Sequence, residues 1–126
     1  MKQVLFFIGS ILFFISCTEK LDERVIENLD VKISWYRESE ITSAHDFIDV
    51  IKDNQTIQIL KANENGIVNV IIKKDSIIIK TKPSLIFYEF KEKAFNYNVK
   101  IDSTATHEEW IESMKKYGLW FKKDNK

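Results

Sequence analysis

The sequence contains few of the residues on which several kinds of site depend. Its 126 residues include three glycines, one proline, two histidines and one cysteine. So few glycines leave no glycine-rich loop to hold a phosphate, and a lone cysteine excludes an intrachain disulfide. The low glycine and proline content also argues against a long flexible linker. We therefore expect one domain that is stabilised by its hydrophobic core.

The charge of the chain is balanced, because 19 Lys and Arg residues are matched by 19 Asp and Glu residues. Proteins that bind nucleic acid usually carry a basic face, so this balance predicts no nucleic-acid partner. Hydrophobic residues make up 44% of the chain and aromatic residues 13%. This content is sufficient for the core of a single domain.

Residues 1–16 have the pattern of a secretory signal peptide. Lys2 provides a positive charge, the run from Val4 to Ile15 is apolar, and Ser16 is small. The run of about 12 residues is shorter than the roughly 20 residues that a membrane-spanning helix needs. We therefore expect a signal peptide that is removed, although an N-terminal membrane anchor is an alternative.

The segment from Phe14 to Cys17 resembles the lipobox of bacterial lipoproteins. It departs from the commonest form at Phe14, where leucine is usual, and at Ile15, where a smaller residue is common. The resemblance implies that lipid is attached to the Cys17 thiol, that cleavage occurs before Cys17, and that the new amine is acylated with a fatty acid such as palmitate. The alternative at this position is an ordinary cleaved signal that leaves an unmodified thiol.

The residue after Cys17 bears on the location of the protein. Thr18 stands where an aspartate would favour the inner membrane, by resemblance to lipoprotein sorting in Gram-negative bacteria. The sequence therefore predicts a cell-envelope protein anchored by lipid, in the outer membrane rather than the inner one. Residues 17–29 are expected to form the lipidated cysteine and a tether, which passes into a weak helical turn or leads into a strand.

A single globular domain is expected over residues 30–121, followed by a charged tail at 122–126. Apolar and polar residues alternate, or β-branched residues gather, in six or seven segments typical of strands. These segments are 30–37, 45–52, 56–62, 67–73, 76–82, 85–91 and 95–101. Residues 53–55 predict a turn, and Asn65-Gly66 predicts a type I′ hairpin. Lys74-Asp75 predicts a second hairpin with a two-residue turn, in which Ile72 faces Ile77, Val70 faces Ile79 and Val68 faces Thr81. A third hairpin is expected to join the last two segments across residues 92–94.

The pattern changes to a helical period after residue 105. Thr106 and Glu109 have the spacing of a capping box, and Gly118 provides a stop. The apolar stripe between them consists of Trp110, Ile111, Met114 and Tyr117. The sequence thus predicts an α+β domain in which an antiparallel, hairpin-rich sheet is covered on one face by a C-terminal amphipathic helix. The alternative is a small β-sandwich or a partly closed barrel with the same helix.

The candidate metal-ligating residues are His45, Asp46, Asp49 and Asp53. A metal site needs three or four converging ligands, and no partner motif accompanies these four. His107 is expected to be a surface residue in the first turn of the helix. The scattered serines lack the flanking glycines of a nucleophile elbow. We therefore predict no catalytic residue, no metal and no cofactor.

The aromatic residues are more numerous than a minimal core requires, so a few exposed ones are candidates for a binding patch. The function predicted from the sequence is a lipid-anchored envelope protein that binds a partner or ligand without catalysis, an envelope protein being the possible partner. Two alternatives remain: a small hydrolase or metal-dependent enzyme, and a structural lipoprotein of the envelope.

Overall fold

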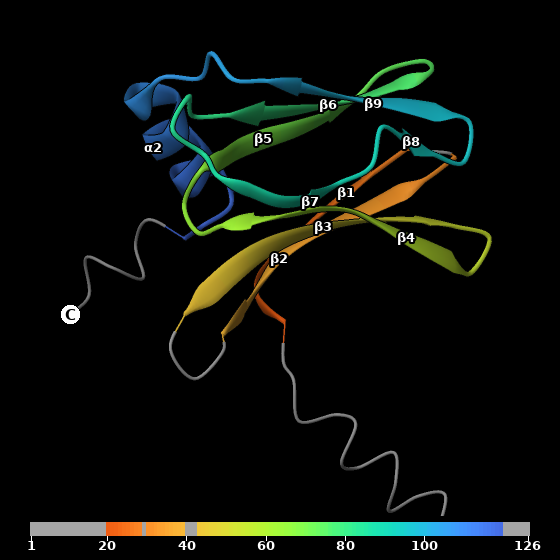
Figure 1. Cartoon of the computed structure of the whole chain (residues 1–126), viewed down its shortest axis with the longest axis horizontal. Coiled ribbons are helices and arrows are strands. Elements are labelled where there is room, and N and C mark those ends of the chain that lie inside the picture. The colour runs from red at the N-terminus through yellow and green to blue at the C-terminus, as the bar shows by residue number, and fades with distance from the viewer. Residues whose placement is uncertain (1–19, 29, 40–42, 120–126) are drawn as a thin grey trace, which may run out of the picture.

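The computed structural model describes residues 20–28, 30–39 and 43–119. These residues form nine strands and one helix, an α+β fold as the sequence predicted (Figure 1). The predicted signal peptide, Cys17 and the tail at 122–126 lie outside the described residues.

The strands form two sheets, which pack face to face (Figure 1). Sheet A is antiparallel and has the order β1 (Leu21–Glu27), β2 (Lys32–Ser39), β3 (Ala44–Lys52), β4 (Gln55–Asn63) and β7 (Phe87–Phe90). Sheet B is mixed and has the order β5 (Ile67–Ile72), β6 (Ser76–Thr81), β9 (Tyr97–Asp102) and β8 (Lys93–Ala94), with β6 and β9 parallel. The arrangement has two layers, where the sequence favoured a single sheet with a helix on its face.

The core lies between the two sheets. Its most deeply buried aliphatic side chains, all 0% exposed, come from both layers: Ile33, Ile48, Val50, Ile59, Leu60, Ile77 and Ile79. Trp35 adds the largest buried ring. β-Branched residues suit this position because their stiff side chains pack well on a pleated surface.

The first strand lies within the segment that the sequence placed in the tether. β1 pairs with β2, with Arg24 opposite Trp35 and Ile26 opposite Ile33. The register shifts between Leu21 and Arg24, and Asp22 has a φ of 50°. This irregularity breaks the alternation of apolar residues, which explains why the sequence did not predict a strand. Sheet A therefore begins at Leu21, and not at residue 30.

The type I′ hairpin predicted at Asn65-Gly66 is wrong. Its neighbours β4 and β5 belong to different sheets, so the chain crosses between layers at this point. Only Asn65 has a positive φ, of 67°, whereas a type I′ turn needs two such residues. The turn predicted at residues 53–55 has this geometry, because Asp53 and Asn54 have φ values of 51° and 64°.

Contacts with distant residues determine the crossing at Asn65-Gly66. The backbone N–H of Asn65 donates to Asp46 Oδ2 at 3.1 Å, and Arg37 Nη2 donates to Asn65 Oδ1 at 2.8 Å. A Cβ on Gly66 would lie 2.1 Å from Leu85 Cδ1. The glycine is therefore needed for close packing and not for a hairpin.

The hairpin predicted at Lys74-Asp75 is confirmed. Ile72 pairs with Ile77 and Val70 with Ile79, as the alternation predicted. The expected pairing of Val68 with Thr81 is wrong, because a register shift between Ile67 and Asn69 places Ile67 opposite Thr81.

The third predicted hairpin is wrong. Strand β7 pairs with β4 in sheet A, and β9 pairs in parallel with β6 in sheet B. Only the short strand β8 is antiparallel to β9, across a turn in which Phe95 has a φ of 57°. The sequence pattern of β9 identifies a strand but carries no information about the direction of its neighbour.

The helix α2 (His107–Lys116) has the ends that the sequence predicted. The Thr106 hydroxyl accepts from the Glu109 N–H at 3.2 Å, and the Glu109 carboxylate accepts from the Thr106 N–H. At the other end Gly118 has a φ of 73°, and the Leu119 N–H donates to the Met114 carbonyl at 2.8 Å. These bonds satisfy backbone groups that a helix end leaves without partners.

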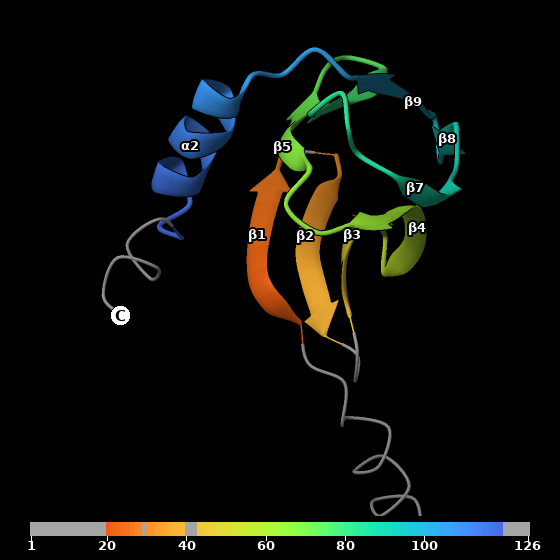
Figure 2. The ribbon, with the colours of Figure 1, turned by 60° about the vertical axis from the view of Figure 1, so that its left-hand side comes forward.

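The helix does not cover a sheet face as predicted. Figure 2 shows α2 beside β1 and β5, the strands that lie at one edge of each sheet. Met114 is its buried residue, and Tyr117 meets Trp35 edge to face at 5.7 Å. Trp110 is only partly buried, with the Lys82 ammonium 4.3 Å from its ring. Met114 and Tyr117, rather than the larger ring of Trp110, therefore connect the helix to the core.

Truncation of Ile79 tests the core. Ile79→Ala should lower the free energy of unfolding by about 2–5 kcal/mol, because the side chain is fully buried and leaves a cavity. The neighbouring Ile78→Ala is the matched control, since Ile78 lies partly exposed on the opposite face of β6 and should cost about 1 kcal/mol or less. Urea denaturation of both variants measures the difference. Equal losses would contradict the burial of Ile79 between the sheets.

Candidate functional site

The structure separates the four residues considered as metal ligands. Asp46 accepts from Arg37 Nε at 2.8 Å, His45 meets the Tyr88 ring at 5.0 Å, and Asp53 lies in an exposed turn. In the part of the chain that the structure describes, no three His, Cys, Asp or Glu side chains gather to hold a metal ion. His107 is exposed in the first helical turn, as predicted, and stacks on Trp110 at 5.5 Å.

Asp49 belongs to a different cluster, on the outer face of sheet A. The Tyr36 hydroxyl donates to Asp49 Oδ2 at 3.0 Å, while Asp49 Oδ1 has no hydrogen-bond partner among the described residues. Phe47 stacks on Tyr36 at 5.5 Å, and the Ser34 hydroxyl donates to Glu23 nearby. Asp49 is only 7% exposed.

Burial governs the ionisation of this pair. It raises the pKa of Asp49 above its ordinary value, although the hydrogen bond from Tyr36 acts in the opposite direction. It also raises the pKa of Tyr36, and the Asp49 charge adds to that shift. A buried carboxylate with one unsatisfied oxygen is costly, so ionised Asp49 destabilises the folded state.

Arg24 is a buried charged residue that the sequence analysis did not single out. Its guanidinium lies 4.0 Å from the Trp35 ring and 5.8 Å from the Tyr117 ring, and Nη2 donates to Met114 Sδ at 3.6 Å. The residue is 8% exposed, and its burial lowers its pKa. The contacts join β1, β2 and α2. An arginine in a polar segment gives no such indication, because its partners lie far away in the sequence.

An exposed apolar surface covers β7 and the residue before it. We call it the β7 surface and define it by Ile86, Phe87, Tyr88 and Phe90, which are 55%, 38%, 55% and 37% exposed. β7 is also the last strand of sheet A within the described residues, so one of its backbone edges has no strand partner there. The sequence assigned these residues to a strand, but it could not show that the strand lies outside the core.

Two cavities lie on the other side of the fold, along β5. The first has a volume of about 540 Å³ and is lined by β5, by Lys80 and by one side of α2, including Glu108 and Glu112. The second has a volume of about 450 Å³ and lies between β1 and β5. Both are lined by Asn69, Ile71 and Lys116, so they adjoin each other.

The chain matches no family model, no curated protein and no solved structure.

Replacement of Asp49 should change the pH dependence of stability. The Asp49 carboxyl binds its proton more tightly in the folded state than in the unfolded state, where the pKa of the carboxyl is near 3.8. The stability that Asp49 contributes is therefore complete below that pH and is lost as the pH rises through the folded-state pKa. Asp49→Asn removes this loss, and its amide oxygen still accepts from Tyr36.

Urea unfolding of Asp49→Asn and of the parent chain between pH 4 and pH 8 measures the effect. The variant should gain stability relative to the parent as the pH rises. Asp75→Asn, at an exposed position, controls for the loss of one negative charge. A relative stability of Asp49→Asn that falls with rising pH would contradict the direction of the shift.

Proposed function

We propose that the protein is a lipid-anchored cell-envelope module that binds an envelope protein through the β7 surface, without catalysis. The observation that carries this proposal is the exposure of Ile86, Phe87, Tyr88 and Phe90 on one edge strand. Single exposed apolar residues are ordinary, but four of them within the five positions 86–90 of a small domain mark a candidate binding surface.

The chemistry of the β7 surface suits a protein partner. Aromatic rings bury a large area at a low cost in side-chain entropy, and the Tyr88 hydroxyl can still form a hydrogen bond at the rim. The unpaired edge of β7 offers backbone donors and acceptors to an extended segment of a partner. The imidazole of His45, whose ring centre lies 5.0 Å from that of Tyr88, adds a polar group beside the β7 surface.

The proposed anchor places the β7 surface near the membrane. Strand register puts the start of β1 and the start of β7 in one row across sheet A, which runs through Leu21, Arg37, Asp46, Ala62 and Phe87. Cys17 precedes Leu21 by four residues, which span at most about 14 Å. A lipid on Cys17 would therefore hold this end of sheet A close to the bilayer, where an envelope partner is within reach.

The location rests on the lipobox resemblance of residues 14–17, because a single cysteine follows the apolar run there. Within the ranges that the structure describes, no helix has both the length and the apolar character to cross a bilayer. Thr18 supports the outer membrane over the inner one, as in the sequence argument above.

Loss of the Cys17 thiol tests the anchor. Cys17→Ser should abolish lipid attachment, because serine has no sulfur to form the thioether, and the precursor should accumulate or be released by another peptidase. Growth of cells with an alkyne-tagged fatty acid, followed by detection of the tag on the protein, provides the measurement. Labelling of the serine variant at the level of the parent would disprove lipidation at Cys17.

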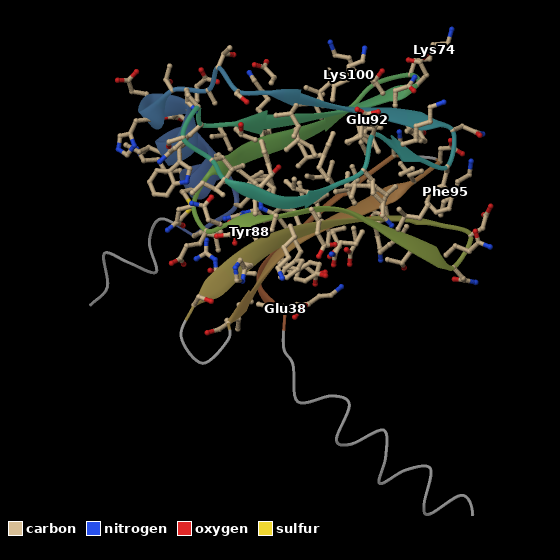
Figure 3. The ribbon with its side chains drawn as sticks, in the orientation of Figure 1. Glu38, Lys74, Tyr88, Glu92, Phe95 and Lys100 are labelled. Atoms are coloured by element: carbon tan, nitrogen blue, oxygen red, sulfur yellow. The ribbon has the colours of Figure 1, made fainter. Side chains whose placement is uncertain are left out.

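Photo-crosslinking in living cells tests the β7 surface. A photoreactive phenylalanine analogue at position 88 should give a crosslinked product of defined mass, because Tyr88 is 55% exposed in the proposed interface. The same analogue at position 100 is the matched control. Lys100 is exposed on sheet B and lies well away from Tyr88 (Figure 3).

A second substitution links the crosslink to the surface. Phe87→Lys should reduce the product formed from position 88 by about tenfold or more, because it introduces a charge into the β7 surface next to Tyr88. Products of equal yield from positions 88 and 100, or a product that Phe87→Lys leaves unchanged, would rule out the β7 surface as the partner site.

A further inference from the structure

The sandwich is open on the side that carries α2. β1 is the first strand of sheet A and β5 the first strand of sheet B, and no other strand of the described chain pairs with their outer edges. The cavity of about 450 Å³ lies between them and is lined from β1 by Val25, Ile26 and Glu27 and from β5 by Val70, Ile71 and Ile72. We call this space the β1–β5 slot. It lies at the opposite edge of sheet A from β7.

The strand register shows which backbone groups point into the slot. In antiparallel strands, hydrogen-bonded pairs alternate with pairs whose N–H and C=O groups point outward. The Lys73 N–H donates to the Ser76 carbonyl at 2.8 Å, so the outward residues of β5 are Val70 and Ile72. The Asn28 N–H donates to the Val31 carbonyl at 3.1 Å, so those of β1 are Val25 and Glu27.

These four residues all line the slot, so two unpaired strand edges flank one cavity. The chain satisfies one of the outward groups itself, because Asn69 Oδ1 accepts from the Val70 N–H at 2.9 Å. Unpaired strand edges commonly accept an added strand. An extended chain within the slot would have hydrogen-bonding partners on both sides, whereas a compact ligand would leave most of these groups unused.

The charges beside the slot indicate the kind of chain. The adjoining cavity brings Glu108, Glu109 and Glu112 of α2 to one wall. Glu109 is paired with Lys80 at 3.4 Å, but Glu108 and Glu112 form no ion pair with another described residue. Glu27 adds a further carboxylate at the β1 side. Lys116 lines both cavities and offsets one of these three negative charges, so the lining keeps an excess of two. A segment with lysine or arginine is therefore favoured over an acidic one.

We propose that the β1–β5 slot binds an extended segment of a second protein, which has alternating apolar residues and basic residues among the polar ones. The segment pairs with β1 on one side and β5 on the other and thereby joins the two sheets. Its apolar side chains contact Ile26 and Ile72, which pack against the core, and its basic residues face Glu108 and Glu112 of α2. This site is independent of the β7 surface and of the lipid anchor.

Synthetic peptides provide the test, with the full chain in detergent. The probe is a fluorescent seven-residue peptide of alternating lysine and valine, and fluorescence anisotropy measures its binding. One control peptide has glutamate in place of lysine, and another has N-methylated valines that cannot donate backbone hydrogen bonds. The lysine peptide should bind at least about tenfold more tightly than either control.

Amide hydrogen exchange locates the bound peptide. The amides of Val25, Glu27 and Ile72 should exchange more slowly in the presence of the lysine peptide, since they point into the slot. Equal affinity of the three peptides, or slower exchange confined to β7, would overturn the proposal. Both results leave the crosslinking test of the β7 surface unaffected.

A matched pair of variants on β1 completes the test. Val25→Lys places a charge in the slot and should weaken binding of the lysine peptide by about tenfold or more. Leu21→Lys makes the same change at an exposed position of the same strand outside the slot and should leave binding unchanged. Self-association of the parent chain that Val25→Lys abolishes would place a second copy in the slot and would also overturn the proposal.

Discussion

The packing of sheet B on sheet A is the interaction on which the rest of the structure depends. Among the described residues, its core contains six buried isoleucines, which come from both layers: Ile33, Ile48, Ile59, Ile67, Ile77 and Ile79. Because both sheets bury one face in the same core, the chain must cross between layers. The crossing at Gly66 leaves no room for a Cβ, and the link from β7 to β8 provides another crossing.

The same packing produces the two candidate binding surfaces. Two open sheets have edges, and natural proteins usually cover or blunt such edges because they attract other strands. In this fold Asn69 and α2 cover part of the β5 edge, whereas the β7 surface keeps its aromatic residues in contact with solvent. The exposed groups of β1 and β7 that remain lie at opposite edges of sheet A, so the two proposed sites do not overlap.

The buried polar residues show where packing prevailed over solvation. The Arg24 guanidinium is removed from water but makes cation–π contacts with the rings of Trp35 and Tyr117. Its hydrogen bond to Met114 connects α2 to sheet A. Asp49 keeps one hydrogen bond, from Tyr36, and its other oxygen has no described partner. Arg24 thus contributes to the position of the helix, while ionised Asp49 opposes folding.

The sequence by itself determined the local features of this protein. Alternation predicted most strands, and the capping box and Gly118 predicted the ends of α2. The Lys74-Asp75 turn predicted the β5–β6 pairs nearest to it, from Ile72–Ile77 to Val70–Ile79. All of these features depend on residues close together in the chain. Only the tertiary structure decided which strands are neighbours, that β6 and β9 run parallel, and that Asn65-Gly66 is a crossing. Both candidate surfaces belong to this second group. Their exposure depends on contacts between residues far apart in the chain, which no local pattern encodes.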